Sequence, residues 1–280
     1  PDGVRTPFVE HQAEAALLGG SERRMRLHFT VTPEHLPLFE AQRTAWQQTL
    51  DETYGCSLEV GYSVQKPATD TLALADDGQP LRDDDGQLVL RPGGHGALIE
   101  NLADLQADVV LIRNIDNVVP DCRKGPNLEA TRLLTGLLLN LQEEQHALLK
   151  SLHAEGGEPV LRDLCFAFLC DRLQVEAPLD ADLTTLIDLL DRPLRICGMV
   201  ANQGEPGGGP FWVRGEDGCV TPQIVEGAQV NQDDPAQRAI LKQSTHFNPV
   251  DMVCGVRDWR GEPYDLGRFV DDKAVIVTEK

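Results

Sequence analysis

The sequence is poor in basic residues. Its 280 residues include 45 Asp and Glu but only 25 Lys and Arg, which gives a formal net charge of −20 and a pI near 4.6. Such a surface repels polyanions, which argues against nucleic acid as a partner and against binding to an anionic membrane. Most basic residues are Arg, and Asp outnumbers Glu, a composition that favours solubility at high salt.

Long apolar runs and paired cysteine motifs are also missing. The longest apolar stretch, Leu133–Leu141, is far shorter than the ~20 residues that span a bilayer. No basic segment is followed by an apolar one, so we expect a cytoplasmic protein. The 7 cysteines are odd in number and contain no C-x-x-C pair, which argues against a disulfide framework and a zinc site.

Both ends of the sequence suggest a piece of a longer protein. The first residue is Pro1 rather than Met, and the last apolar run, Ala274–Val277, has the pattern of a strand that stops just before the end. We therefore expect further sequence on either side.

Helix and strand signals alternate through the first part of the sequence. Apolar periodicity and caps predict helices at Pro7–Leu18 and from Thr32 to Tyr54, and strands at Arg26–Val31, Leu58–Val64 and Asp108–Arg113. Strands joined by helical crossovers predict an α/β fold with a mostly parallel sheet and helices on both faces. We find no internal repeat.

The middle of the sequence is helical. Amphipathic patterns at Leu128–Leu152, Val160–Leu173 and Ala181–Leu190 follow one another, and strand signals return at Leu194–Val200. We interpret residues 1–127 as the first part of an α/β core, 128–192 as a helical insertion, and 193–280 as the second part of the core.

A glycine-rich turn, Arg91 to Gly96, lies between a strand signal and a helix signal. Gly93, Gly94 and Gly96 allow the backbone to approach a ligand closely, and the free N–H groups of a following helix attract anions. Arg91 could bind phosphate through its guanidinium group, and His95 could donate or accept a hydrogen bond. A tight turn that binds nothing explains the same residues.

A second polar group follows the predicted strand at Asp108–Arg113. Ligands of open parallel sheets bind at the carboxyl ends of the strands, where Asn114, Asp116 and Asn117 would lie. A carboxylate between two amides could hold Mg²⁺ beside substrate phosphates. Alternatively, Asp116 and Asn117 simply cap a turn.

The last third of the sequence holds a weaker set of candidates. A glycine-rich loop, Gly204–Pro210, includes Glu205, Gly207 and Gly208 and could cover a ligand. Glu226 at a strand end could accept hydrogen bonds from sugar hydroxyls, and His246, Asn248 and Asp251 could line the same cleft or help to hold a metal. For each of these residues a plain structural role is the simpler interpretation.

These segments, in this order, resemble a bacterial family of unknown function, number 4301, over nearly the whole chain. That family in turn resembles the UDP-sugar pyrophosphorylases. Pro92, Gly94 and Gly96 match a turn that contacts uracil in those enzymes, and Gln65 falls where they place a glutamine ahead of it.

Further matches lie after the turn. Asn114, Asp116 and Asn117 match an Asn-x-Asp-Asn element near the metal and the sugar phosphate. Gly198–Gly209 and Gln223–Glu226 resemble the strand pair of the sugar site, and His246-Phe247 resembles an Asn-His-Phe element close to it.

The resemblance implies a Rossmann-like, GT-A-type fold and a Mg²⁺-dependent transfer of a nucleotidyl group to a sugar 1-phosphate, with release of pyrophosphate. Asp116 and Arg91 would act in catalysis, Asp116 and Asp251 would bind the metal, and Gln65 with the turn would bind a nucleoside triphosphate. Asn114, Asn117, Glu205, Gly207, Gly208, Glu226, His246 and Asn248 would contact the sugar phosphate.

Two departures weaken the enzymatic interpretation. The glycine-rich loop that grips the triphosphate in those enzymes, and the lysine motif after it, precede the matched region and do not occur in this sequence. We therefore expect this chain alone to be inactive. A non-catalytic protein that binds a nucleotide or phosphosugar remains the alternative, as does a glycosyltransferase if the Asp-x-Asp spacing within Asp83–Asp85 binds a metal rather than forming a solvated hairpin.

Overall fold

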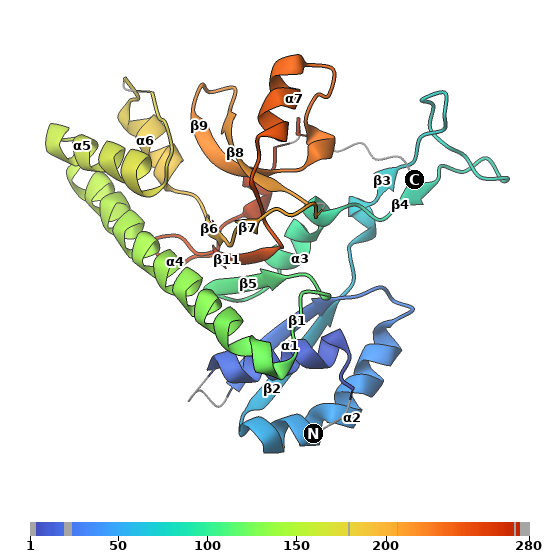
Figure 1. Ribbon diagram of the computed structural model, residues 1–280. Helices are drawn as coiled ribbons and strands as arrows, with labels where there is room; N and C mark the ends of the chain where they lie inside the picture. Colours follow the sequence, from blue (N-terminus) through green and yellow to red (C-terminus); the bar gives the residue numbers. More distant parts are fainter. Residues whose placement is uncertain (1–3, 20–23, 179, 206, 272, 275–280) are drawn as a thin grey trace. The chain divides into compact units, whose positions relative to one another are not determined.

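The computed structural model describes residues 4–19, 24–178, 180–205, 207–271 and 273–274. The chain forms two compact α/β units (Figure 1). The first contains residues 1–106, 118–128 and 265–268, and the second contains residues 107–117, 129–264 and 269–280. The predicted domain boundaries at 127/128 and 192/193 stay a prediction. Residues 275–277 of the strand predicted at Ala274–Val277 lie outside the described residues.

The first unit is built on a parallel strand pair. Helix α1 (Pro7–Gly19) precedes β1 (Arg24–Thr30), and α2 (Leu36–Tyr54) connects β1 to β2 (Ser57–Ser63). The strands pair in parallel from Arg24 opposite Ser57 to Thr30 opposite Ser63. The predicted elements therefore form, although α2 begins at Leu36, after a turn in which the His35 and Leu36 N–H groups donate to Thr32 O.

Aromatic rings form the centre of the core of this unit. Phe8 of α1 packs edge-on against Phe29 of β1 and Phe39 of α2, with ring centroids 4.8 and 4.9 Å apart. Tyr62 of β2 completes the group. Each of the four main elements contributes one ring, so this cluster fixes both helices against the strand pair.

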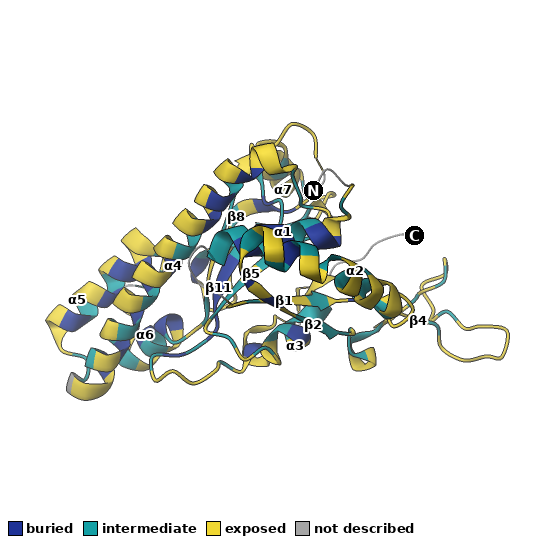
Figure 2. Cartoon of the chain, turned by 90° about the horizontal axis from the view of Figure 1, so that it is seen from below, coloured by how far each residue is buried: buried dark blue, intermediate teal, exposed yellow. Residues whose placement is uncertain are grey.

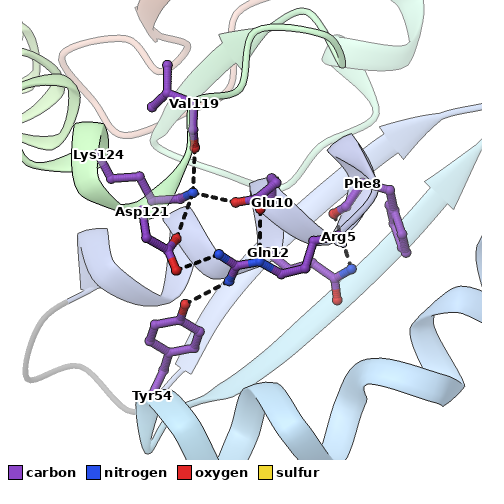
Figure 3. A network of polar contacts seen from close by, with 8 residues as sticks. All are labelled: Arg5, Phe8, Glu10, Gln12, Tyr54, Val119, Asp121 and Lys124. Carbon is purple, nitrogen blue, oxygen red and sulfur yellow. Dashed lines mark hydrogen bonds and ion pairs between the residues drawn. The ribbon is translucent and has the colours of Figure 1, made fainter. Parts of the chain in front are cut away.

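Charged residues connect α1 to the first turn of α4 (Asp121–Glu155) (Figure 3). Lys124, whose side chain is only 1% exposed, contacts Glu10 and donates to the Val119 carbonyl and, at 3.0 Å, to Asp121. Arg5 pairs with the same Glu10 at 2.8 Å and with Asp121 at 2.5 Å. Two cations and two carboxylates thus neutralise one another. Arg5, Glu10 and Lys124 are largely shielded from water, whereas the Asp121 side chain is 57% exposed.

An eight-residue repeat builds a three-way junction of short β segments at residues 71–91. Ala73 N–H donates to Val89 O, Val89 N–H to Leu81 O, and Leu81 N–H to Ala73 O, at 2.8 to 3.0 Å, which closes a ring of residues eight positions apart. Strands β3 (Thr71–Leu72) and β4 (Leu90–Arg91) form one arm. Two tight hairpins form the other arms and diverge as loops beyond β3 and β4 (Figure 1).

The hairpin turns explain the repeat. Each tip has the sequence Asp-Asp-Gly-Gln, with Gly78 and Gly86 at φ of +77° and +78°, a conformation that glycine adopts without strain. Our reading that the sequence has no internal repeat was therefore wrong: the spacing of these two tips was visible in it. The Asp83–Asp85 segment forms the expected exposed hairpin turn.

A helical layer forms much of the second unit. Helices α4, α5 (Pro159–Ala167) and α6 (Leu183–Leu190) enclose a buried leucine-rich cluster. The π-helical segment η3 (Phe168–Arg172) continues α5. Buried residues recur along α4 at intervals of three or four, visible as a dark stripe in Figure 2, which is why the amphipathic pattern predicted these helices.

The strands of the second unit are antiparallel. Strand β11 (Asp251–Gly255) pairs in this orientation with both β5 (Val109–Arg113) and β6 (Leu194–Cys197), and β8 (Gly209–Arg214) pairs with β9 (Val220–Val225). The short β7 (Val200–Ala201) pairs with β10 (His246–Phe247). A mixed α/β fold is confirmed, but the prediction of a mostly parallel sheet is wrong. The sheets are small, and among the described strands only β1 and β2 pair in parallel.

Short helices complete both units. They are η1 (Pro67–Thr69), η2 (His95–Leu98) and α3 (Ile99–Ala103) in the first unit, η4 (Gly227–Gln229) and α7 (Pro235–Lys242) in the second, and η5 (Leu266–Phe269) near the end of the chain. We did not predict α7, although Asp234 caps it and Pro235 opens it. No helix in the described part of the chain combines the length and apolar character that crossing a bilayer requires.

Candidate functional site

Gln65 and the glycine-rich turn lie together in the first unit. A Cβ atom on Gly93 would stand 2.7 Å from the Thr69 carbonyl oxygen and 3.5 Å from Gln65 Nε2. Gln65 Nε2 donates to Thr69 Oγ1 at 3.2 Å, and Thr69 Oγ1 donates to Lys66 O. The backbone at Gly93 can therefore approach the Gln65–Thr69 segment only because position 93 carries no side chain.

The rest of the turn is open to solvent. Arg91, Pro92, Gly94, His95 and Gly96 are exposed, and a Cβ on Gly94 or Gly96 would meet nothing within 4 Å. The helix that follows is a short 3₁₀ segment, η2, which runs into α3. Both are too short to supply the strong N-terminal dipole that the sequence suggested, so a ligand would rely on side chains and individual N–H groups.

Polar side chains gather where β1 and β2 end, just ahead of Gln65. The Ser63 hydroxyl contacts His28 Nε2 at 2.8 Å and Thr30 Oγ1 at 3.2 Å. Asn101 of α3 donates to Ser63 Oγ and to Val64 O, and its own Oδ1 is buried with no hydrogen-bond partner among the described residues. Sequence reasoning missed Asn101, whose amide fixes the end of β2 beside Gln65.

The Asn-x-Asp-Asn turn lies in the second unit and is tied to the residues that precede β11. Asn117 N–H donates to Asn114 O at 3.1 Å and closes the turn, and the Asn117 side chain donates to Pro249 O. Asp116 at the turn's apex is exposed. The structure thus brings together two of the segments that the sequence singled out.

Arg113 and Asp251 form the second tie between these segments. The guanidinium group binds both carboxylate oxygens of Asp251 at 3.1 Å, and the two residues are opposite each other across the β5–β11 pair. Arg113 also donates to Thr131 Oγ1 on α4. Asp251, which we predicted as a metal ligand, is therefore already engaged by a cation, and sequence reasoning did not single out Arg113.

Asn248 is the buried centre of this arrangement. It is 5% exposed, its side-chain amide donates to Gly198 O at 2.7 Å, and its backbone N–H donates to Gly208 O at 2.8 Å. Its Oδ1 accepts the N–H of Val250 at 3.0 Å. Val250 has φ of +60°, an unfavourable conformation for a β-branched residue. These contacts give Asn248 a structural role.

The glycine loop and Glu226 adjoin Asn248. A Cβ on Gly208 would lie 2.4 Å from Ile224 Cγ2 and 3.4 Å from Glu226 Cγ, and one on Gly207 would meet the Phe247 ring at 3.4 Å. Glu226 caps η4, where its side chain and that of Gln229 form a capping box. Glycine at position 208 is therefore required by packing, and Glu226 is partly engaged in the cap.

Glu205 and His246 are exposed and make local contacts. Glu205 Oε2 accepts the backbone N–H of Gln203 at 2.7 Å, and His246 Nδ1 contacts Thr245 Oγ1 at 2.8 Å. These contacts support a local structural role for each residue. Their contact with sugar stays a prediction.

The described residues contain no group of three or more His, Cys, Asp or Glu side chains that could hold a metal ion. Asp116 and Asp251 were the two predicted metal ligands. Asp251 is bound to Arg113, which leaves Asp116 as the predicted ligand outside that ion pair. These residues do not fit a site built from protein carboxylates alone, so a Mg²⁺ ion held by Asp116 would need substrate phosphates and water as its other ligands.

A shallow depression of about 480 Å³ lies elsewhere in the second unit. Gln142 and His146 of α4 line it together with the Arg257–Gly261 segment. None of the predicted site residues contributes to it, so it does not support the predicted chemistry.

Comparison with curated proteins and with solved structures finds no significant match. A family model, described as a domain of unknown function (DUF4301), matches residues 1–280. This match covers both units and every residue of the candidate site. The chain belongs to the DUF4301 family.

Proposed function

We propose that this chain carries the nucleotide-binding and sugar-binding parts of a sugar-nucleotidyltransferase-like protein related to the UDP-sugar pyrophosphorylases, on a GT-A-like fold. The observation that carries the proposal is the packing of the Gly93 turn on Gln65 beside the carboxyl end of the parallel β1–β2 pair. Ligands of α/β proteins commonly bind at that end of the strands.

The first unit would hold the base and phosphates. Gln65 presents an amide that can pair with the polar edge of a base, and the open backbone at Gly94 and Gly96 leaves room for close approach. Arg91 is exposed next to the turn and can bind a phosphate through two N–H groups. Pro92 and His95 flank the same surface.

The second unit would hold the sugar phosphate. Asn114 and Asn117 belong to one turn, and the bond from Asn117 to Pro249 holds this turn beside the segment that contains Asn248. Asn248, whose side chain is bonded to Gly198 and Val250, would shape the site rather than contact the sugar directly. Gly207 and Gly208 bring backbone close to Glu226 and to the Asn248 strand end. Neutral amide and backbone groups can donate hydrogen bonds to sugar hydroxyls and accept hydrogen bonds from them. A sugar can therefore bind here without basic side chains, which are scarce in this protein.

Asp116 would be the protein ligand of Mg²⁺. The ion, when bound, would neutralise charge on the phosphates. Arg91 would bind a phosphate oxygen and orient the group that is transferred. Positioning and charge neutralisation carry most of the rate in phosphoryl-type transfers, so few residues need react covalently.

A non-catalytic binding protein is the second candidate. Loss of the triphosphate-gripping loop and of the lysine motif after it from the full-length gene would favour this candidate, whereas their presence would favour the enzyme. Both candidates require nucleotide binding at the turn, whereas release of pyrophosphate distinguishes them. We expect this chain by itself to bind nucleotide without turnover.

A thermal-shift titration with UTP, other nucleoside triphosphates and UDP-sugars, each with and without Mg²⁺, tests the proposal. A ligand at a hundredfold excess over Kd stabilises the folded state by about 2.7 kcal/mol. We expect Gln65→Ala to abolish the UTP shift and Asp116→Ala to abolish only its Mg²⁺-dependent part. Asp84→Asn, on an exposed hairpin tip, is the matched control and should leave both unchanged.

Absence of a shift with every nucleotide would refute the proposal. Equal shifts in the Gln65→Ala, Asp116→Ala and Asp84→Asn variants would also refute it, because binding would then take place elsewhere. If UTP binds and the full-length protein releases no pyrophosphate with any sugar 1-phosphate, the non-catalytic candidate is the correct one.

A further inference from the structure

The three-way junction at residues 71–91 presents an apolar face to solvent. Leu72 is opposite Leu90, Leu74 is opposite Pro80, and Arg82 is opposite Leu88. Residues opposite each other across paired strands point to the same side, as do residues two positions apart on one strand. The members of these three pairs therefore all point to one face of the junction. Ala73, Leu81 and Val89, which alternate with them along the chain, point to the other face.

The leucines of this face are unusually accessible. Leu72, Leu74, Leu88 and Leu90 are 43, 57, 47 and 54% exposed. The ring of hydrogen bonds through Ala73, Leu81 and Val89 holds the three arms together, so the leucines keep a defined arrangement. Monomeric soluble proteins rarely leave a contiguous apolar patch uncovered, and such patches commonly mark interaction sites.

Acidic residues lie at the tips of two of the three arms that carry the apolar face. The hairpin tips carry Asp76 and Asp77 on one arm and Asp83, Asp84 and Asp85 on the other, and all five are exposed. Asp77 and Asp83 accept backbone N–H groups within their own turns, which fixes the tips. Arg82 also lies on the face and donates to Gly86 O at 2.7 Å, inside its own hairpin.

Charge decides which partner suits this face. A second copy of the chain would bring a net charge of −20 and identical acidic tips against the first, which is unfavourable. A partner segment with apolar anchors flanked by Lys or Arg would cover the leucines and complement the acidic tips. The same tips oppose an anionic membrane.

We propose that the face formed by Leu72, Leu74, Leu88 and Leu90 binds an apolar segment of another protein that is flanked by basic residues. The rigid junction supplies shape, the leucines supply buried area, and the aspartates at the tips select for positive charge. This role does not depend on nucleotide binding, because none of these residues belongs to the proposed nucleotide or sugar site.

A synthetic peptide of alternating Leu and Lys is a suitable probe, with binding measured by fluorescence anisotropy. Peptides with Ser in place of Leu, or Glu in place of Lys, test the apolar and the charged contribution separately. The double variant Leu74→Ser/Leu88→Ser removes two exposed leucines without touching the hydrogen-bonded ring. Leu133→Ser/Leu137→Ser, on an exposed part of α4, is the matched control, since those leucines are 68 and 44% exposed.

We expect the Leu74→Ser/Leu88→Ser variant to bind the Leu-Lys peptide at least tenfold more weakly than the unmodified chain, and the α4 variant to bind it equally well. Asp76→Asn/Asp84→Asn should weaken binding severalfold and reduce its dependence on salt. Circular dichroism establishes that each variant is folded.

Equal affinity in the two leucine variants would overturn the proposal, because the peptide would then bind the acidic surface at large. A concentration-dependent dimer in sedimentation that Leu74→Ser/Leu88→Ser dissolves would also overturn it, since a second copy would be the occupant. The nucleotide shift of these variants is a separate readout, so failure here leaves the proposed function unaffected.

Discussion

Val250, which lies between Asn248 and the start of β11, has a strained backbone conformation. Its φ of +60° places a β-branched side chain in the left-handed region, and the bond from its N–H to Asn248 Oδ1 helps to hold it there. Such a conformation costs on the order of 1–3 kcal/mol, and Asn tolerates it better than Val.

Val250→Asn is therefore expected to raise the free energy of unfolding by about 1 kcal/mol, measured by urea denaturation. Val225→Asn is the control, because that residue is equally half-buried in the ordinary strand conformation of β9 and should lose stability on replacement. Comparable losses of stability in both variants would show that the backbone at position 250 stores no strain.

His146 on α4 makes stability depend on pH near neutrality. Burial lowers its pKa below the ordinary value of 6.5 and the nearby Lys150 ammonium lowers it further, against the opposing influence of Asp258, the Arg257 backbone and Asp191. The unfolded chain therefore takes up this proton at a higher pH than the folded chain does. The stability that the neutral form of His146 contributes is therefore fully present above pH 6.5. It is lost as the pH falls below 6.5, because the unfolded chain then binds more protons than the folded chain.

We expect the urea midpoint to decrease as the pH is lowered from about 7.5 to 5.5, because of this linkage. His146→Gln should flatten the decrease, and the further replacement His28→Gln should flatten it more, since burial also lowers the pKa of His28. An unaltered slope in the double variant would contradict the assignment.

At the scale of elements, the ion cluster in Figure 3 decides how firmly the start of α4 is held to α1. Lys124→Met would leave Glu10 and Asp121 with Arg5 as their remaining cation in this cluster. Removing one partner of a buried charged group costs about 3–5 kcal/mol, whereas exposed pairs contribute about 1 kcal/mol or less.

The measurement is a urea titration of Lys124→Met beside Arg172→Met. Arg172 pairs with Glu144 at 2.7 Å, but both side chains are more than two-fifths exposed. We expect a large loss of stability for the first variant and a small one for the second. If the two losses are alike, burial does not strengthen the cluster.

Several elements were predictable because their signals are local. Pro7–Leu18, the helix ending at Tyr54 and the strand at Asp108–Arg113 were found within a few residues, since amphipathic periodicity is read from neighbouring positions. The helix α7 was not predicted although Asp234 and Pro235 mark its start, because its eight residues give only a short periodic signal. The eight-residue repeat becomes meaningful only through the hydrogen bonds that join Ala73, Leu81 and Val89.

At the scale of the whole molecule, the excess of acidic residues opposes folding. A net charge of −20 on 280 residues produces repulsion that salt screens, with a Debye length of about 10 Å at 0.1 M falling to about 3 Å at 1 M. We therefore expect the thermal midpoint to rise as NaCl is increased from about 0.02 to 0.5 M. A midpoint that falls over this range would mean that attractive ion pairs, such as those around Lys124, outweigh the repulsion.

The candidate site shows the limit of sequence reasoning at this scale. The resemblance implied that Asp116 and Asp251 share a site, and the bond from Asn117 to Pro249 holds their two segments together. The partner of Asp251 could not be deduced, because Arg113 lies 138 residues away in sequence and meets it only through the pairing of β5 with β11.

The sequence by itself determined the α/β class, most helix positions and the exposed acidic hairpins. These follow from composition, periodicity and turn chemistry, which act between residues close together in the chain. The family was recognised separately, from the resemblance of whole motifs, and the match over residues 1–280 shows it. Tertiary structure alone decided that β11 lies between β5 and β6 in antiparallel pairing, that Gly93 rests on Gln65, and that Asp251 is held by Arg113. Those outcomes depend on which distant surfaces bury each other best, and no local pattern specifies that choice.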